Sequence, residues 1–127
     1  MSPEKIDRIA LDMLRILCSN PRCKPVVGDI SWSNSIFAEA FLKYSKRVRV
    51  VFQTRPHLAF AKSHMQHHPR VNLWEYVLLN DWGIWANAMP NREDRLATWS
   101  KKVLECAEEV KDKYPDRVHI VALKDLN

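Results

Sequence analysis

Four polar residues have side chains suited to acid–base or hydrolytic chemistry: Asp29, Ser31, Asn80 and Asp81. The first two close one short apolar segment of the chain, and the last two follow another. If both segments are neighbouring parallel strands, their carboxyl ends bring Asp29 and Asp81 side by side. Close carboxylates suit a catalytic acid and base or a divalent-metal site, because each disfavours ionisation of the other. The alternative is that these residues only cap helices and form turns.

The segments around these residues resemble two sequence blocks of the SGNH hydrolases. Gly28-Asp29-Ile30-Ser31 is similar to the Gly-Asp-Ser nucleophile block, Leu79-Asn80-Asp81 is similar to the Asn-Asp oxyanion block, and residues 116–119 form a late Asp-x-x-His. The resemblance implies a small hydrolase. The chain departs from the family where Ile30 occupies the nucleophile position and Ser31 comes one residue late. We therefore infer no membership, and the resemblance also fits an inactive relative.

Three histidines share a helical spacing, since His64 and His68 are four residues apart and His57 precedes His64 by seven. Two histidines at that spacing can bind zinc. Here no glutamate lies between them, and Pro69 takes His68 out of helical geometry. The sequence therefore predicts no metal site. With only two glycines, the phosphate-binding loops of nucleotide enzymes are also absent, and no cofactor is predicted.

One segment makes the whole protein basic. Between Ala40 and Trp74 the chain has seven Lys or Arg residues, four of its five histidines, and no Asp or Glu. The chain carries +5, and the 13 basic residues outside this segment face 15 acidic ones, a balance of −2. A local positive field attracts anions, so we expect an anionic partner, with nucleic acid as the leading candidate.

The start of a predicted helix at Thr54 and Arg55 is a natural anion site within this segment. Trp32, Trp82 and Trp85 could stack on bases if they reach the same edge of the protein. The alternative is a solvated basic surface that only keeps the protein in solution. The predicted anion-binding residues are Arg47, Arg49, Thr54, Arg55, His57, Lys62 and Arg70.

The loop over residues 81–89 is unusually apolar for a loop, because it contains two tryptophans, an isoleucine and a methionine. It can fold back onto the sheet, cover a pocket, or meet another protein. In the last case Trp82 and Trp85 would bind a protein partner or a second copy of the chain. The sequence thus leaves three functions open: anion binding, a small hydrolase at the strand ends, and a protein-interaction module.

Apolar periodicity predicts the elements that position these residues. Amphipathic helices are expected over 3–18, up to residue 44, over 54–67 and over 92–114, with Trp99 and Trp74 in the core. Strands are expected over 25–30, 47–52, 73–79 and 116–123. This alternation predicts a single α/β domain over 1–127, with an N-terminal helix before a three-layer α/β/α arrangement around a mostly parallel four-stranded sheet.

The remaining sequence features concern location. No apolar run approaches the ~20 residues of a membrane span, and the N-terminus lacks the layout of a signal peptide. Three cysteines give no disulfide framework. We therefore expect a soluble intracellular protein, cytoplasmic or nuclear.

Overall fold

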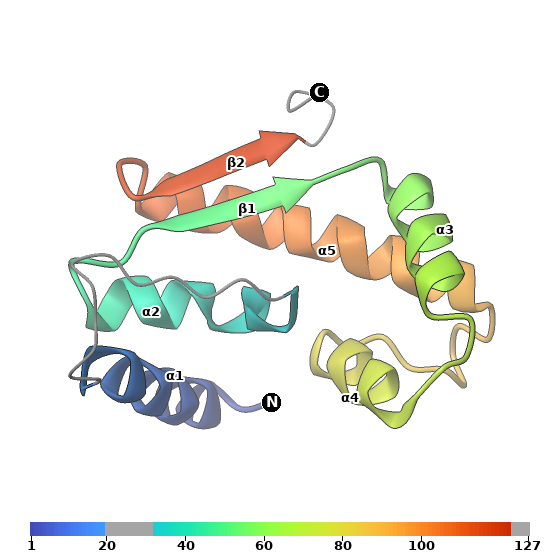
Figure 1. Ribbon diagram of the computed structural model, residues 1–127, viewed down its shortest axis with the longest axis horizontal. Coiled ribbons are helices and arrows are strands. Elements are labelled where there is room, and N and C mark those ends of the chain that lie inside the picture. The colour runs from blue at the N-terminus through green and yellow to red at the C-terminus, as the bar shows by residue number, and fades with distance from the viewer. Residues whose placement is uncertain (20–31, 123–127) are drawn as a thin grey trace. The chain divides into compact units, whose positions relative to one another are not determined.

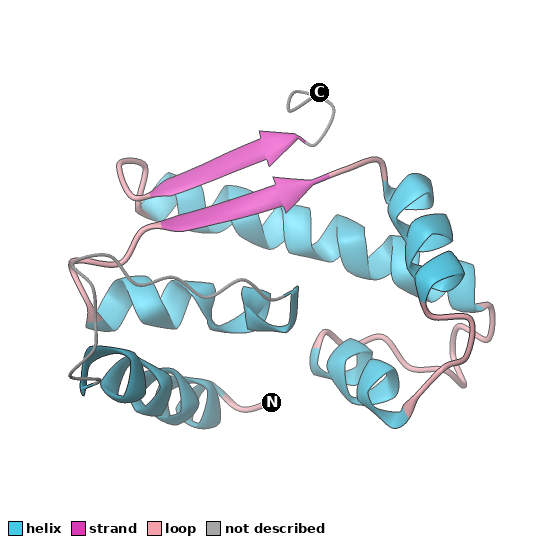
Figure 2. Ribbon diagram, viewed as in Figure 1, coloured by secondary structure: helices cyan, strands magenta, loops and turns pink. Residues whose placement is uncertain are grey.

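The computed structural model describes residues 1–19 and 32–122 (Figures 1 and 2). The chain divides into two compact units, residues 1–50 and 51–127. The strand predicted over 25–30 lies outside the described residues, together with Asp29 and Ser31. The prediction of one domain over the whole chain stays a prediction.

In its described residues the first unit is mostly helical, and its last residue, Val50, begins strand β1 (Val50–Thr54). Helix α1 (Pro3–Ser19) packs against the 3-10 helix η1 (Trp32–Phe37) and against α2 (Ala38–Tyr44). Ser2 caps α1, because its hydroxyl accepts a hydrogen bond from the Lys5 amide at 3.2 Å. The buried residues of this unit are small or aliphatic: Ala10, Ala38, Ala40 and Leu42.

The second unit holds a small sheet and three helices. Strand β1 (Val50–Thr54) pairs in parallel with β2 (Val118–Ala122), and between them run α3 (His57–His67), α4 (Leu73–Asp81) and α5 (Arg92–Lys113). Helix α5, orange in Figure 1, packs against both α3 and β2. An isolated pair of strands is marginal in water, so this packing stabilises the sheet. The core comprises Phe52, Ala61, Leu79, Ile84, Leu96, Trp99, Val103, Ala107, Val110 and Val118.

The prediction of a four-stranded sheet in a three-layer α/β/α domain is wrong, because residues 73–79 form a helix and the described residues contain two strands. Asn72 starts this helix, since its side chain accepts a hydrogen bond from the Glu75 amide at 2.9 Å. Apolar periodicity alone does not separate a short buried strand from a short helix. Val77 is the one β-branched residue of the segment, so its composition also favours a helix.

Several predicted elements are confirmed. The Asn91 side chain accepts a hydrogen bond from the Asp94 amide at 3.0 Å and begins α5, and Trp99 is buried. Helix α3 ends at His67, before Pro69. The strands near 47–52 and 116–123 are present as β1 and β2. Among the described residues, no helix combines the length and apolar character needed to span a bilayer.

Candidate functional site

Three cations of the second unit lie along α3. Arg55 is half-buried in the connection from β1 to α3, Lys62 is exposed in the middle of α3, and Arg70 is exposed in the connection to α4. Residues 51–74 contain no Asp or Glu. Within the described part of the chain, none of the three makes an ion pair. Among the described residues their positive charges therefore have no counter-charge at short range.

The N-terminus of α3 adds backbone donors next to Arg55. Pro56 is the N-cap residue and supplies no side-chain hydrogen bond, and the first turn holds no acidic residue. Free amides at a helix start attract anions. The two other predicted anion ligands here have protein partners: His57 Nδ1 lies 2.9 Å from Ser100 Oγ, and the Thr54 hydroxyl donates to the Val121 carbonyl at 3.5 Å.

The remaining basic residues of the predicted segment belong to the first unit. Arg47 and Arg49 are exposed and precede β1. Lys43 forms an ion pair with Asp7 at 3.6 Å, and the same carboxylate accepts a hydrogen bond from the Tyr44 hydroxyl at 2.9 Å. Lys43 is therefore partly neutralised within its own unit.

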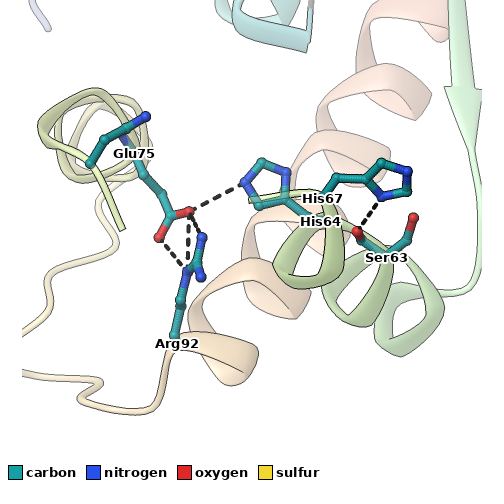
Figure 3. Close-up of polar contacts among 6 residues, drawn as sticks. Ser63, His64, His67, Glu75 and Arg92 are labelled. Atoms are coloured by element: carbon teal, nitrogen blue, oxygen red, sulfur yellow. Dashed lines mark hydrogen bonds and ion pairs between the residues drawn. The ribbon is translucent and has the colours of Figure 1, made fainter. Parts of the chain in front are cut away.

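A buried ionic cluster that the sequence analysis missed lies at Glu75, which is 4% exposed (Figure 3). Arg92 donates three hydrogen bonds to its carboxylate, from Nη2 to Oε1 at 2.7 Å, from Nε to Oε2 at 3.0 Å and from Nε to Oε1 at 3.3 Å. His64 Nε2 lies 3.2 Å from Oε1. One carboxylate thus joins α3, α4 and the first residue of α5. Glu75 therefore adds no uncompensated negative charge beside the basic residues.

Burial lowers the pKa of His64 below its ordinary value of 6.5. The Glu75 carboxylate opposes this change, while His68 and Arg92 add to the lowering of the pKa. The ring of His68 lies 4.8 Å from that of His64, between centroids. A neutral His64 can donate its Nε2 hydrogen to Glu75, so the cluster needs no second cation. Among the described residues, no group of three His, Cys, Asp or Glu side chains could hold a metal ion.

The predicted catalytic pair Asn80 and Asp81 does not lie at a sheet edge. These are the last two residues of α4, both half-buried, because the segment before them is a helix. The expectation that Asp81 lies beside Asp29 depended on a strand over 73–79, and this strand is absent because the segment is helical. Asp29 and Ser31 lie outside the described residues. His119, from the late Asp-x-x-His, is exposed on β2.

The apolar loop after α4 is partly packed. Ile84 is buried, and its amide donates to the Leu79 carbonyl at 3.0 Å. Trp82 is half-buried, and its carbonyl accepts a hydrogen bond from Lys102 Nζ at 3.0 Å. Trp85 is 53% exposed. The loop therefore folds back against the end of α4 and leaves Trp85 at the surface. Trp32 lies in η1, and its side chain is outside the described part.

The outward face of α4 is apolar. Leu73 is 77% exposed, Trp74 is 71% exposed and Val77 is 41% exposed. The prediction that Trp74 belongs to the core is wrong, because Glu75 and Leu79 occupy the inward face of the helix. Large apolar side chains grouped at a surface indicate a binding site more strongly than single ones do.

Comparison of the chain with protein-family models, with curated proteins and with solved structures found no match.

Proposed function

We propose that the second unit binds nucleic acid through phosphate contacts made by Arg55, Lys62 and Arg70. The observation that carries this proposal is that all three cations lie along α3 without a carboxylate partner in the described residues. Cations that face no counter-charge gain most from neutralising phosphate and releasing its counterions. The nearest acidic residue in sequence, Glu75, is buried and already paired with Arg92.

The spacing of the cations favours a polymer over a single phosphate. Arg55 precedes α3, Lys62 lies in its second turn and Arg70 follows its end. An 11-residue helix is about 16 Å long at 1.5 Å per residue. A ligand that contacts all three must therefore carry several phosphates along its length, as a nucleic acid backbone does.

The start of α3, which has no side-chain cap, lies next to Arg55 and supports the same proposal. Its first amides can donate to a phosphate oxygen beside the Arg55 guanidinium. Arginine can add a bidentate pair of hydrogen bonds to that phosphate. These contacts are independent of base sequence, so the proposed binding is sequence-tolerant.

The test compares two charge-matched variants of the full chain. One carries Arg55→Ala, Lys62→Ala and Arg70→Ala, and the other carries Lys101→Ala, Lys111→Ala and Lys113→Ala, three exposed changes on α5. Fluorescence anisotropy measures the affinity of each for a labelled oligonucleotide. We expect the first variant to lose at least tenfold in affinity and the control to stay within about twofold of the unaltered protein. Equal losses in both variants would overturn the proposed site.

A competition arm distinguishes a polymer from a single phosphate group. Unlabelled oligonucleotide, a free mononucleotide and inorganic phosphate each compete with the labelled oligonucleotide. The proposal expects the oligonucleotide to compete at far lower concentration than either small anion. If the mononucleotide competes at the same concentration as the oligonucleotide, the site binds a single phosphate group and the proposal of a polymer ligand is wrong.

A further inference from the structure

We propose that Trp74 adds a surface for base stacking beside the basic row formed by Arg55, Lys62 and Arg70. This addition makes single-stranded nucleic acid the preferred ligand. The inference rests on the proposed function, because it places a base next to a phosphate bound by Arg70. Trp74 is the second residue of α4 and is largely exposed. Leu73 and Val77 lie to one side of it around the helix, and the three residues fall within about 100° of arc at 3.6 residues per turn.

The position of Trp74 in the chain keeps it close to positive charge. It follows Arg70 by four residues, and four residues span at most about 14 Å. The stretch free of Asp and Glu ends at Trp74. Glu75, the next residue, is buried, and Arg92 neutralises its carboxylate (Figure 3). An exposed tryptophan beside unpaired cations is typical of proteins that bind single strands.

The other aromatic residue of this helix region is already engaged. The Arg95 guanidinium lies 5.7 Å from the centre of the Tyr76 ring. Among the described residues, Trp74 has no such ring or cation partner. Its indole face is therefore available to stack on a base.

Charge favours this ligand over a protein that would cover the same apolar face. A protein partner or a second copy would need an acidic rim to match Arg70 and Lys62. Single-stranded nucleic acid matches both features at once, because each nucleotide carries one phosphate and one unpaired base. A duplex matches only the charge, since its bases are stacked inside.

The experiment measures binding of a labelled 12-nucleotide single strand and of the duplex of the same sequence to the full chain. We expect Trp74→Ala to weaken single-strand binding by about five- to hundredfold, which corresponds to one lost base stack. Duplex binding and the salt dependence of single-strand binding should stay unchanged. Trp74→Phe should retain most of the affinity, and Ile16→Ala, the loss of another largely exposed apolar side chain, should leave the affinity unchanged.

Failure of this inference differs from failure of the proposed function. If Trp74→Ala binds the single strand as the unaltered protein does, the proposed stacking surface is wrong, while loss of binding on removal of the three cations still supports the basic row. If no variant or strand shows salt-dependent binding, both are wrong. If sedimentation shows a dimer that Trp74→Ala dissociates, a second copy covers this face and the inference is overturned.

Discussion

At Glu75 a single carboxylate accepts hydrogen bonds from a guanidinium and an imidazole in a largely dehydrated position. Burying a charge is costly unless it is paired, so the energy of this cluster depends on all its members being present. Removal of one member leaves the other charge buried without a partner. The cluster therefore holds α3, α4 and α5 together. Its contribution to the free energy of unfolding can be measured separately from ligand binding.

Glu75→Gln should lower the free energy of unfolding by about 3–5 kcal/mol, because Arg92 then stays buried without its counter-charge. Urea denaturation followed by circular dichroism measures this change. Glu109→Gln, an exposed charge loss on α5, is the control and should change stability by less than about 0.5 kcal/mol. The double change Glu75→Leu with Arg92→Met should recover most of the loss. A stability loss for Glu75→Gln as small as that of the control would contradict the account.

His64 should make stability depend on pH. Because burial lowers its pKa in the folded state, the unfolded chain binds a proton at a higher pH than the folded chain does. Between the two pKa values the unfolded state carries more protons, so the free energy of unfolding rises with pH and falls as the solution is acidified below about 6.5. His64→Gln should flatten this dependence in urea titrations between pH 7.5 and 5.

The exposed His67→Gln on the same helix is the control for His64. Within the described ranges its side chain makes one hydrogen bond, with the Ser63 carbonyl at 2.8 Å. It should keep the slope of stability against pH that the unaltered protein shows. An unchanged slope in His64→Gln would mean that other groups cause the pH dependence.

At the scale of elements, a side-chain cap stabilises the start of α4, the helix between α3 and α5. Asn72→Ala should cost about 1 kcal/mol of stability, since the Glu75 amide loses its side-chain acceptor. Asn72→Asp should retain the cap. Asn87→Ala, at an exposed loop position, should have little effect. If thermal unfolding shows equal midpoints for Asn72→Ala and Asn87→Ala, the cap contributes nothing to stability.

The elements that the sequence predicts well have local signals. Helix α5 has a cap at Asn91 and a long apolar face, and α3 has Pro56 before it and Pro69 after it. Residues 73–79 carry the same kind of signal, Asn72 followed by Glu75 at the third position, as in a capping box. That spacing could have identified α4. The run of apolar residues instead suggested a strand, because a buried strand and a short helix share the same pattern.

The residues of the candidate site also differ in whether a local sequence signal predicts them. A count of charges identifies the basic segment that contains Arg55, Lys62 and Arg70, because a stretch without acidic residues is visible in the sequence. The ion pair of Glu75 with Arg92 depends on how α4 meets α5, which no local pattern records. The exposure of Trp74 depends on the same packing, since a tryptophan in an apolar run is ordinarily buried.

At the scale of the whole molecule, charge is unevenly distributed along the chain. The segment from Ala40 to Trp74 carries seven cations and no acid, and the rest of the chain sums to −2. Such a distribution attracts polyanions over a range set by the Debye length, about 8 Å at physiological ionic strength. Three of these seven cations lie along α3 in the second unit, and under the proposed function they should account for a measurable part of the salt-sensitive affinity.

The most direct test of this claim is the salt dependence of affinity for a single-stranded oligonucleotide. Each phosphate contact with a single strand contributes about 0.7 to the slope of log affinity against log salt concentration. Removal of Arg55, Lys62 and Arg70 together should therefore reduce the magnitude of the slope by about 2. The charge-matched variant at Lys101, Lys111 and Lys113 should keep the slope of the unaltered protein. Equal slopes in all three proteins would contradict phosphate binding along α3.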